Sequence, residues 1–306
     1  NIEWFGDAGN GPTNDTQQEQ NVRTILQNIG ADIYGLTEIV SETRLASVVS
    51  QMPGYAYVIG NFGSHVNPPD PAGGSVADAQ KLAFVYKTSV FSNVSTRPLI
   101  NNQNISSTSY NSWSSGRYPF LMKADVTLNG QTRTVNFVLI HGKANTSPTT
   151  TSYNRRKAAS DELRDTLMTY FATANVIVLG DFNDDLDATI ADGITPPTTS
   201  YSAFTSDNVN FFAPTLALSQ AGKKSTVSYN DMIDHVIVSN ELQSSYMSST
   251  ASVLTDVTAL VTNYASTTSD HYPVFTRFLL TVEGSLPVKL ITFNAVKDRS
   301  NVKLTW

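Results

Sequence analysis

The sequence has no cysteine, and this absence excludes disulfide bonds and thiolate metal sites. It leaves the compartment open, because many exported bacterial proteins also lack cysteine. No apolar run approaches the roughly 20 residues that a membrane-spanning helix requires, and no basic and then apolar leader precedes Asn1. We therefore expect a protein that is soluble in this form.

Positive charge is also scarce. The 20 Lys and Arg residues are outnumbered by 26 Asp and Glu residues, which gives a net charge of −6. No overall positive field would draw the protein to nucleic acid or to an anionic membrane. A polyanionic substrate would have to be held by local basic residues and metal ions. The apolar content of 40% is sufficient for a packed core in one large domain or two smaller ones.

Predicted helices and strands alternate along the chain. Apolar periodicity predicts helices over residues 16–28, 42–52 and 153–171. Apolar runs and an Asn-Gly hairpin signal predict strands over residues 31–36, 55–59, 82–86, 120–128, 134–140, 175–179, 232–238 and 274–282. Residues 1–5 read as a strand already under way, so we expect an upstream strand start and a removed export signal. The alternation predicts a layered α/β domain with a mixed sheet.

Carboxylate and histidine side chains recur at the ends of predicted strands, where α/β sheets usually carry their sites. The polar residues at these ends are Glu38, Asp181, Asn183, Asp234, Asp270 and His271. Carboxylate oxygens suit hard ions such as Mg²⁺, Mn²⁺ or Ca²⁺ better than zinc. A carboxylate beside a histidine supplies general-base chemistry. Each residue alone also has a structural reading, because Asp and Asn favour turns and a Glu after a strand is usually a cap or a solvated charge.

Six short segments resemble, in order, the motifs of the endonuclease/exonuclease/phosphatase superfamily, which includes DNase I. They lie at residues 1–4, 35–38, 140–143, 180–183, 233–235 and 269–271. Each motif is weak alone, but six in the correct order make coincidence improbable. The resemblance spans residues 1 to about 282. It implies a DNase I-like α/β sandwich with two packed mixed β-sheets flanked by helices, and metal-dependent phosphoester hydrolysis.

The resemblance also implies a metal site. Glu38 corresponds to the principal metal ligand, with Asn1 and Asp270 close to the ion. Glu3 occupies a position that is acidic in some members. The expected cofactor is Mg²⁺, with Mn²⁺ and Ca²⁺ as alternatives.

Catalytic roles follow from the same resemblance. Asp181 and Asn183 would position or activate the attacking water and contact the scissile phosphate. His271, oriented by Asp234, would either deprotonate that water or stabilise charge on the phosphate. His141 would lie on the other side and donate to a phosphate oxygen or to the leaving group.

Basic residues supply candidate phosphate contacts. Arg117 matches a family arginine near the phosphate, and Lys143 lies in the same motif as His141. One position departs from the DNase I branch, in which a carboxylate supports the first histidine. Gln80 or Lys81 stands there, so His141 lacks an acidic partner that would raise its pKa, and its role as general acid is open.

Two further features have open or structural readings. The run at residues 155–157, Arg-Arg-Lys, either forms a solvated helix face or contacts a polyanion. His235 should face away from Asp234 on the same strand, so we predict a structural role for it.

The final segment differs in character from the rest. Residues 1–284 form the expected catalytic domain, and residues 285–306 read as the start of a truncated β segment. The segment resembles the opening of a C-terminal β-domain common in exported Bacteroidetes proteins. Its alternative reading is an extra edge strand of the main domain. The resemblance, together with the trimmed start, predicts a secreted or cell-surface bacterial protein.

The leading functional hypothesis is an extracellular nuclease that cuts DNA or RNA through phosphate contacts with little base reading. The alternative is a phosphomonoesterase or a sphingomyelinase-like phospholipid phosphodiesterase, acting on a small phosphoester or a lipid. The residues after Asp234 lack the arginine-rich signature of inositol polyphosphate phosphatases, which argues against that branch. A catalytically silent binding module is disfavoured, because every metal and nucleophile position is retained. We expect a monomer with no stable protein partner.

Overall fold

The strands form a large and a small β-sheet in a computed structural model that describes residues 1–66, 73–102, 104–280, 294–298 and 301–305. The large sheet has the strand order β4-β5-β6-β7-β9-β8. Its strands are β4 (Phe91–Pro98), β5 (Phe120–Leu128), β6 (Gln131–His141), β7 (Val176–Asp181), β9 (Asp234–Ser239) and β8 (Phe211–Phe212). The parallel pair β6–β7 lies among antiparallel neighbours, so this sheet is mixed.

The small sheet has the order β1-β3-β2. Its strands are β1 (Ile33–Ile39), β3 (Lys81–Lys87) and β2 (Tyr55–Ile59). Both of its pairings are antiparallel, so the mixed character belongs to the large sheet. The α/β sandwich expected from the sequence is confirmed.

The central strand β3 shows why the two sheets pack together. Leu82 and Phe84 point toward the large sheet, whereas Ala83 and Val85 belong to the core on the opposite face. Phe84 stacks on Phe120 of β5 with ring centroids 5.8 Å apart. Burying both faces of a strand requires a nearly continuous apolar run, and this strand has one. The stacked rings add to the stabilisation that burial of apolar surface provides.

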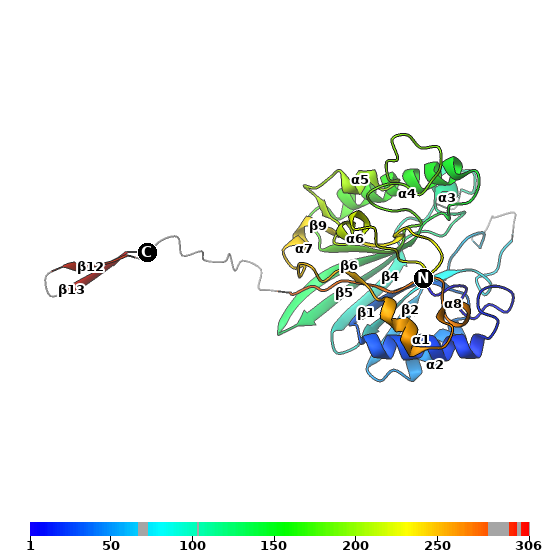
Figure 1. Ribbon diagram of the computed structural model, residues 1–306, viewed down its shortest axis with the longest axis horizontal. Coiled ribbons are helices and arrows are strands. Elements are labelled where there is room, and N and C mark those ends of the chain that lie inside the picture. The colour runs from blue at the N-terminus through cyan, green and yellow to red at the C-terminus, as the bar shows by residue number, and fades with distance from the viewer. Residues whose placement is uncertain (67–72, 103, 281–293, 299–300, 306) are drawn as a thin grey trace.

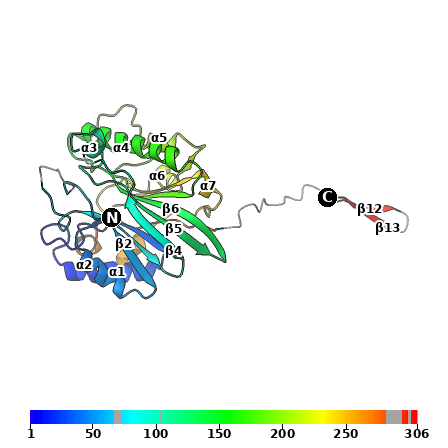
Figure 2. The ribbon, with the colours of Figure 1, turned by 180° about the vertical axis from the view of Figure 1, so that it is seen from behind.

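Helices cover the outer faces of both sheets. On one side of the strands in Figures 1 and 2 lie α1 (Asp15–Ile29) and α2 (Glu42–Ser50), and on the other lie α3 (Thr108–Ser112) and α4 (Thr149–Tyr170). Short elements complete the layers: α5 (Ser202–Thr205), α6 (Leu216–Gln220), α7 (Asn240–Gln243), β10 (Ser252–Val253), η1 (Thr255–Leu260), α8 (Tyr264–Thr267) and β11 (Val274–Phe275). Among the described residues, no helix is both long and apolar enough to span a membrane.

Several elements differ from the sequence predictions at their ends. Strands β2 and β5 have the predicted bounds, while α1 begins at Asp15 because the Asn14 side chain caps it by accepting from the Gln17 amide. Residues 1–5 form a turn with a single parallel bridge from Phe5 to Ile39. Strand β4 was not predicted, because most of its side chains are polar and exposed. The strand predicted at 274–282 is only the two-residue β11 within the described residues, and 281–282 lie outside them.

The C-terminal segment contains a hairpin of β12 (Asn294–Asp298) and β13 (Asn301–Thr305), which pair antiparallel with each other. Residues 281–293, 299–300 and 306 lie outside the described part of the chain. The domain boundary at 284/285 therefore stays a prediction.

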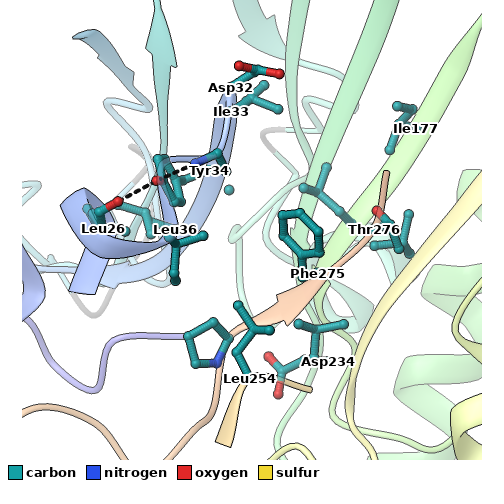
Figure 3. Close-up of a pocket in the computed structure, with 18 of the residues that line it drawn as sticks. Leu26, Asp32, Ile33, Tyr34, Leu36, Ile177, Asp234, Leu254, Phe275 and Thr276 are labelled. Atoms are coloured by element: carbon teal, nitrogen blue, oxygen red, sulfur yellow. Dashed lines mark hydrogen bonds between the residues drawn. The ribbon is translucent and has the colours of Figure 1, made fainter. Parts of the chain in front are cut away.

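An apolar cavity of about 500 Å³ lies beside β1, between α1 and the large sheet. Leu26 of α1, Ile177 of β7 and Phe275 of β11 lie around it, and Asp234 lies at one side (Figure 3). Asn1 and His235 also line it, whereas Glu38, Asp181 and His271 do not. The cavity is thus a space in the sandwich interior, behind the polar cluster.

Gly180 is required where β6 and β7 run closest together. Its φ is +131°, and a Cβ at this position would lie 2.1 Å from the backbone oxygen of Ile140. We expect Gly180→Ala to lower the free energy of unfolding by at least about 2 kcal/mol, since it adds backbone strain and overpacking. Urea denaturation measures this. The control Gly9→Ala adds a methyl group at an exposed turn and should change stability little; equal effects of the two changes would contradict the expectation.

Candidate active site

Three adjacent strands of the large sheet place polar groups in one row. In the parallel pair β6–β7, His141 lies opposite Asp181, and in the antiparallel pair β7–β9, Asp181 lies opposite Asp234. The apolar residues before His141 and Asp181 hold the strands in the core, so both side chains emerge at the same edge of the sheet. Strand register alone therefore brings together residues that are far apart in sequence.

The small sheet contributes Glu38 through an irregularity in β1. The pairing of β1 with β3 shifts register between Leu36 and Ile39, and Glu38 has a φ of +64°. A bulge of this kind re-aims a side chain, and positive φ in a residue other than glycine costs free energy that the surrounding contacts must offset. One such contact is the Trp4 amide, which donates to Glu38 Oε2 over 2.9 Å. The bulge turns the Glu38 carboxylate toward the row of polar groups.

Asn1 connects the two sheets at this point. Its amide nitrogen Nδ2 donates to Glu38 Oε1 over 3.0 Å and to Asp181 Oδ2 over 2.9 Å. His141 Nε2 lies 3.6 Å and 3.5 Å from the same two oxygens. A carboxylate from each sheet, an amide and an imidazole thus surround one small polar space.

His271 and Asp234 form a buried pair. His271 Nδ1 lies 2.7 Å from Asp234 Oδ2, which also accepts from Ser225 Oγ over 2.8 Å. Burial alone would lower the pKa of His271, but the charges of Asp234 and Asp181 outweigh it and raise the pKa to about 9. Burial opposes ionisation of Asp234, yet the charge of His271 holds its pKa below the usual value. The pair therefore contains an imidazolium, whose Nε2 lies 3.8 Å from Asp181 Oδ2.

Asp181 and Asn183 leave one tight turn together. Burial raises the pKa of Asp181 to about 6, although the charge of His271 opposes the shift. Such a carboxylate accepts a proton near neutral pH more readily than an ordinary one. Its Oδ1 accepts from the Asn183 amide over 2.9 Å, and Asn183 has a φ of +53°, which directs its side chain toward Gly142.

His141 lies in a different electrostatic setting. Burial, followed by the positive charge of Arg117, lowers its pKa well below the usual 6.5. Its Nδ1 is buried and has no hydrogen-bond partner in the structure. Gln80, at the position where a supporting carboxylate was expected to be missing, instead accepts from Arg117 Nη1 over 2.9 Å. His141 is therefore a neutral imidazole.

Arg117 and Lys143 lie behind His141. The buried Arg117 guanidinium donates to the backbone oxygens of His141 and Gly142 over 3.1 Å and 2.8 Å, which braces this loop. Lys143 Nζ donates to the backbone oxygen of Ala144 and to Thr146 Oγ1. Direct contact of either residue with phosphate stays a prediction.

Two groups of residues could hold a metal ion. Glu3, Glu38 and Asp270 form the first group: burial, and then the charges of the neighbouring Asp270 and Glu38, raise the pKa of Glu3 to about 7. Glu3 Oε2 is buried without a partner, as expected of an oxygen awaiting a cation. Asp181, Asp234 and His271 also offer ligand atoms within 4.8 Å of one another. In that second group Asp234 and His271 already bond to each other, so the carboxylate group suits a hard divalent ion better.

The comparison with known families agrees with this geometry. Residues 1–271 match the profile of the Endonuclease/Exonuclease/phosphatase family. The chain belongs to this family. Members of this family are divalent-metal-dependent phosphoesterases, and the carboxylates described above fit that chemistry. No curated protein sequence matches the chain significantly.

Solved structures show the same fold at low sequence identity. The human nocturnin catalytic domain with bound sulfate is 19% identical with a TM-score of 0.57, covering 87% of each chain. Mannosyl-6-phosphatase Bt3783 of Bacteroides thetaiotaomicron is 16% identical with a TM-score of 0.53, covering 87% of this chain and 91% of its own. TDP2 of D. rerio with a single-strand DNA product is 12% identical with a TM-score of 0.52, covering 87% and 92%. These likenesses establish the fold.

The structure brings together most of the side chains that the sequence singled out. Glu38, His141, Asp181, Asp234 and His271 surround one space, and Asp270 lies at its half-exposed edge, with Oδ1 3.9 Å from His271 Nε2. Sequence reasoning missed Ser225, which lies in a polar stretch without any motif and supports Asp234. No signal in the sequence marks it.

His235 has a structural role, because its ring is buried on the far side of β9. Its Nε2 donates to the Met232 backbone oxygen, and its Nδ1 lies 3.1 Å from Thr215 Oγ1. Burial lowers its pKa from 6.5 to about 4. Since the folded-state pKa lies below the unfolded one, this contribution to stability is present above pH 6.5 and is lost as the pH falls through 4.

We expect acid to destabilise the protein partly through His235. The difference between the unfolded and folded pKa values of His235 corresponds to about 3 kcal/mol of unfolding free energy, at roughly 1.4 kcal/mol for each pKa unit. In His235→Gln the neutral amide does not titrate, so the gap in unfolding free energy between parent and variant should narrow by about that amount from pH 7 to pH 4. Urea denaturation along this pH series measures the gap, and a gap that stays constant would refute the assignment.

Proposed function

We propose that the protein is a divalent-metal-dependent phosphodiesterase that hydrolyses nucleic-acid strands. The observation that carries the proposal is the buried His271–Asp234 pair, whose Nε2 faces Asp181 beside the amide of Asn1 and the carboxylate of Glu38. Phosphodiester hydrolysis develops charge on phosphate oxygens and needs a proton acceptor for the attacking water. The two imidazoles and Asp181 provide both functions.

The protonation state of each group determines its part in the reaction. Asp181, with its raised pKa, accepts the proton that water loses as the new P–O bond forms; the leaving oxygen keeps the electron pair of the P–O bond that breaks and takes a proton from solvent. Asn183 orients the water from the same turn. The His271 imidazolium, held by Asp234, stabilises the negative charge of the phosphate. His141 remains neutral and donates a hydrogen bond from Nε2 to a phosphate oxygen.

Glu38, Asp270 and Glu3 would hold the metal ion. When bound, a divalent ion at these oxygens polarises the phosphate and offsets the charge that develops on it. Mg²⁺ is our first candidate, because the donors are hard carboxylate oxygens, and Mn²⁺ or Ca²⁺ suit the same set.

The choice of nucleic acid over other phosphoesters rests on structures that share the fold and on the local positive charge. TDP2, which shares the fold, was solved with a single-strand DNA product, whereas another structure with this fold is a mannosyl-6-phosphatase. The cationic side chains behind His141 favour a substrate with several phosphates. An exported location also stays a proposal, and it rests on the expectation drawn from the sequence without a structural observation to add to it.

We expect Asp181→Asn and His271→Ala to lower the kcat for bis-p-nitrophenyl phosphate by about 10²–10⁴-fold, since each removes proton-transfer or charge-stabilising function. EDTA should abolish turnover. Lys123→Ala, which changes an exposed residue of β5, serves as the control. Plasmid DNA, single-stranded RNA, sphingomyelin and p-nitrophenyl phosphate are assayed in parallel. Turnover of the lipid or the monoester with intact nucleic acid would overturn the nuclease assignment.

Metal binding has a readout that does not need turnover. A divalent ion at about 100 times its dissociation constant should stabilise the protein by about 2.7 kcal/mol, seen as a rise in Tm. We expect Glu38→Gln to lose most of that rise because it removes the carboxylate charge. Asp165→Asn removes an exposed carboxylate on α4 and should retain the rise. An equal rise in all three proteins would exclude Glu38 as a ligand.

A further inference from the structure

Four cationic side chains gather around the loop that follows β6. Arg117 and Arg156 are buried, and their donors are engaged inside the protein. Lys143 and Arg155 are only partly buried. Within the described part of the chain, neither of these two forms an ion pair with a carboxylate, and they bond only to carbonyl and hydroxyl oxygens. The protein, whose net charge is −6, thus has two cations without a carboxylate partner near the loop that follows His141.

Arg156 fixes the position of Lys143 relative to α4. Its Nη1 donates to the Lys143 backbone oxygen over 3.0 Å, and its Nε lies 3.6 Å from Asp184 Oδ2. Both side chains of this ion pair are fully buried. Asp184 also accepts from the Ser200 and Ile190 amides, so it anchors the loop after β7. The loops that follow His141 and Asp181 are therefore both bonded to α4.

Arg155 directly precedes Arg156 in α4, and its side chain contacts α3. Its Nε donates to the Asn111 backbone oxygen over 2.8 Å, within α3. Burial, then the charge of Arg155, then those of Arg117 and Arg156, lower the pKa of Lys143. Positive charges held this close together repel one another, and an anion bound between them would relieve that repulsion. Asp184 offsets the charge of Arg156, whereas Lys143 and Arg155 have no carboxylate as an ion-pair partner among the described residues.

We propose that Lys143 and Arg155 form a second phosphate subsite, which binds the phosphate next to the scissile one in a nucleic-acid strand. The inference rests on the proposed function. Lys143 lies two residues beyond His141, and an extended chain spans about 7 Å over that distance, on the scale of one nucleotide. Arg155 presents a guanidinium, which suits phosphate oxygens better than a point charge does. The subsite favours strands over isolated monoesters and over lipids with one phosphate.

The test compares substrates that differ by one phosphate. Thymidylyl-thymidine carries only the scissile phosphodiester, and its 5′-phosphorylated and 3′-phosphorylated forms each add one flanking phosphate. We expect one flanking phosphate to raise kcat/KM at least tenfold, mainly through KM. In Arg155→Gln that advantage should fall at least fivefold, and Arg155→Lys should restore part of it. The control Lys157→Gln removes a charge two positions further along α4, where Lys157 pairs with Asp161, and should keep the advantage.

A binding measurement separates this proposal from the proposed function. Thymidine 3′,5′-bisphosphate should bind the metal-loaded protein at least tenfold more tightly than thymidine 5′-monophosphate, measured by calorimetry, and Arg155→Gln should reduce the difference. If thymidylyl-thymidine is not hydrolysed but the bisphosphate preference holds, the proposed function fails and the subsite stands. If turnover occurs without any preference for a flanking phosphate, or if Arg155→Gln retains the preference, the subsite is refuted.

Discussion

The face-to-face packing of the two sheets is the constraint on which the site depends. His141, Asp181 and Asp234 come from neighbouring strands of the large sheet, whereas Glu38 comes from the edge strand of the small one. Asn1 spans the gap, because its amide donates to a carboxylate on each side. Apolar contacts such as Phe84 on Phe120 set the separation of the sheets. The core thus determines the distances between the polar groups of the candidate site.

Burial is nearly complete for the polar side chains of the large sheet, yet their protonation differs. The charges of Asp234 and Asp181 raise the pKa of His271 against the effect of burial, whereas burial, followed by the charge of Arg117, lowers the pKa of His141. Asp181, between a cation and another carboxylate, has its pKa near 6. In this low-dielectric setting the balance between burial and the neighbouring charges determines each protonation state. Two histidines of one site therefore serve as a cation and as a neutral donor without any difference in exposure.

Much of this arrangement could be predicted from the sequence. The apolar runs before His141 and Asp181 define central strands, and polar residues at their ends define the site. The family motifs predicted which of these residues meet. Strand pairing could then be inferred in outline, because a parallel pair needs a long crossover and α4 provides it.

Other features could not be predicted, because they depend on tertiary contacts. The bulge at Glu38 and the turn at residues 1–5 require positive φ at residues that disfavour it, and only packing makes that tolerable. The burial of Arg117 against the backbone of the His141 loop has no local signal. The pairing of Ser225 with Asp234 joins segments that share no periodicity. Long-range hydrogen bonding decides such positions.

The bridge made by Asn1 gives the site an additional property. Since its two acceptors belong to different sheets, a small slide of one sheet over the other would separate Glu38 from Asp181 while leaving every strand intact. The activity of the proposed site would then depend on how the two sheets are aligned. A molecule with complete secondary structure but misaligned sheets would give the spectrum of a folded protein and would show no activity in an assay.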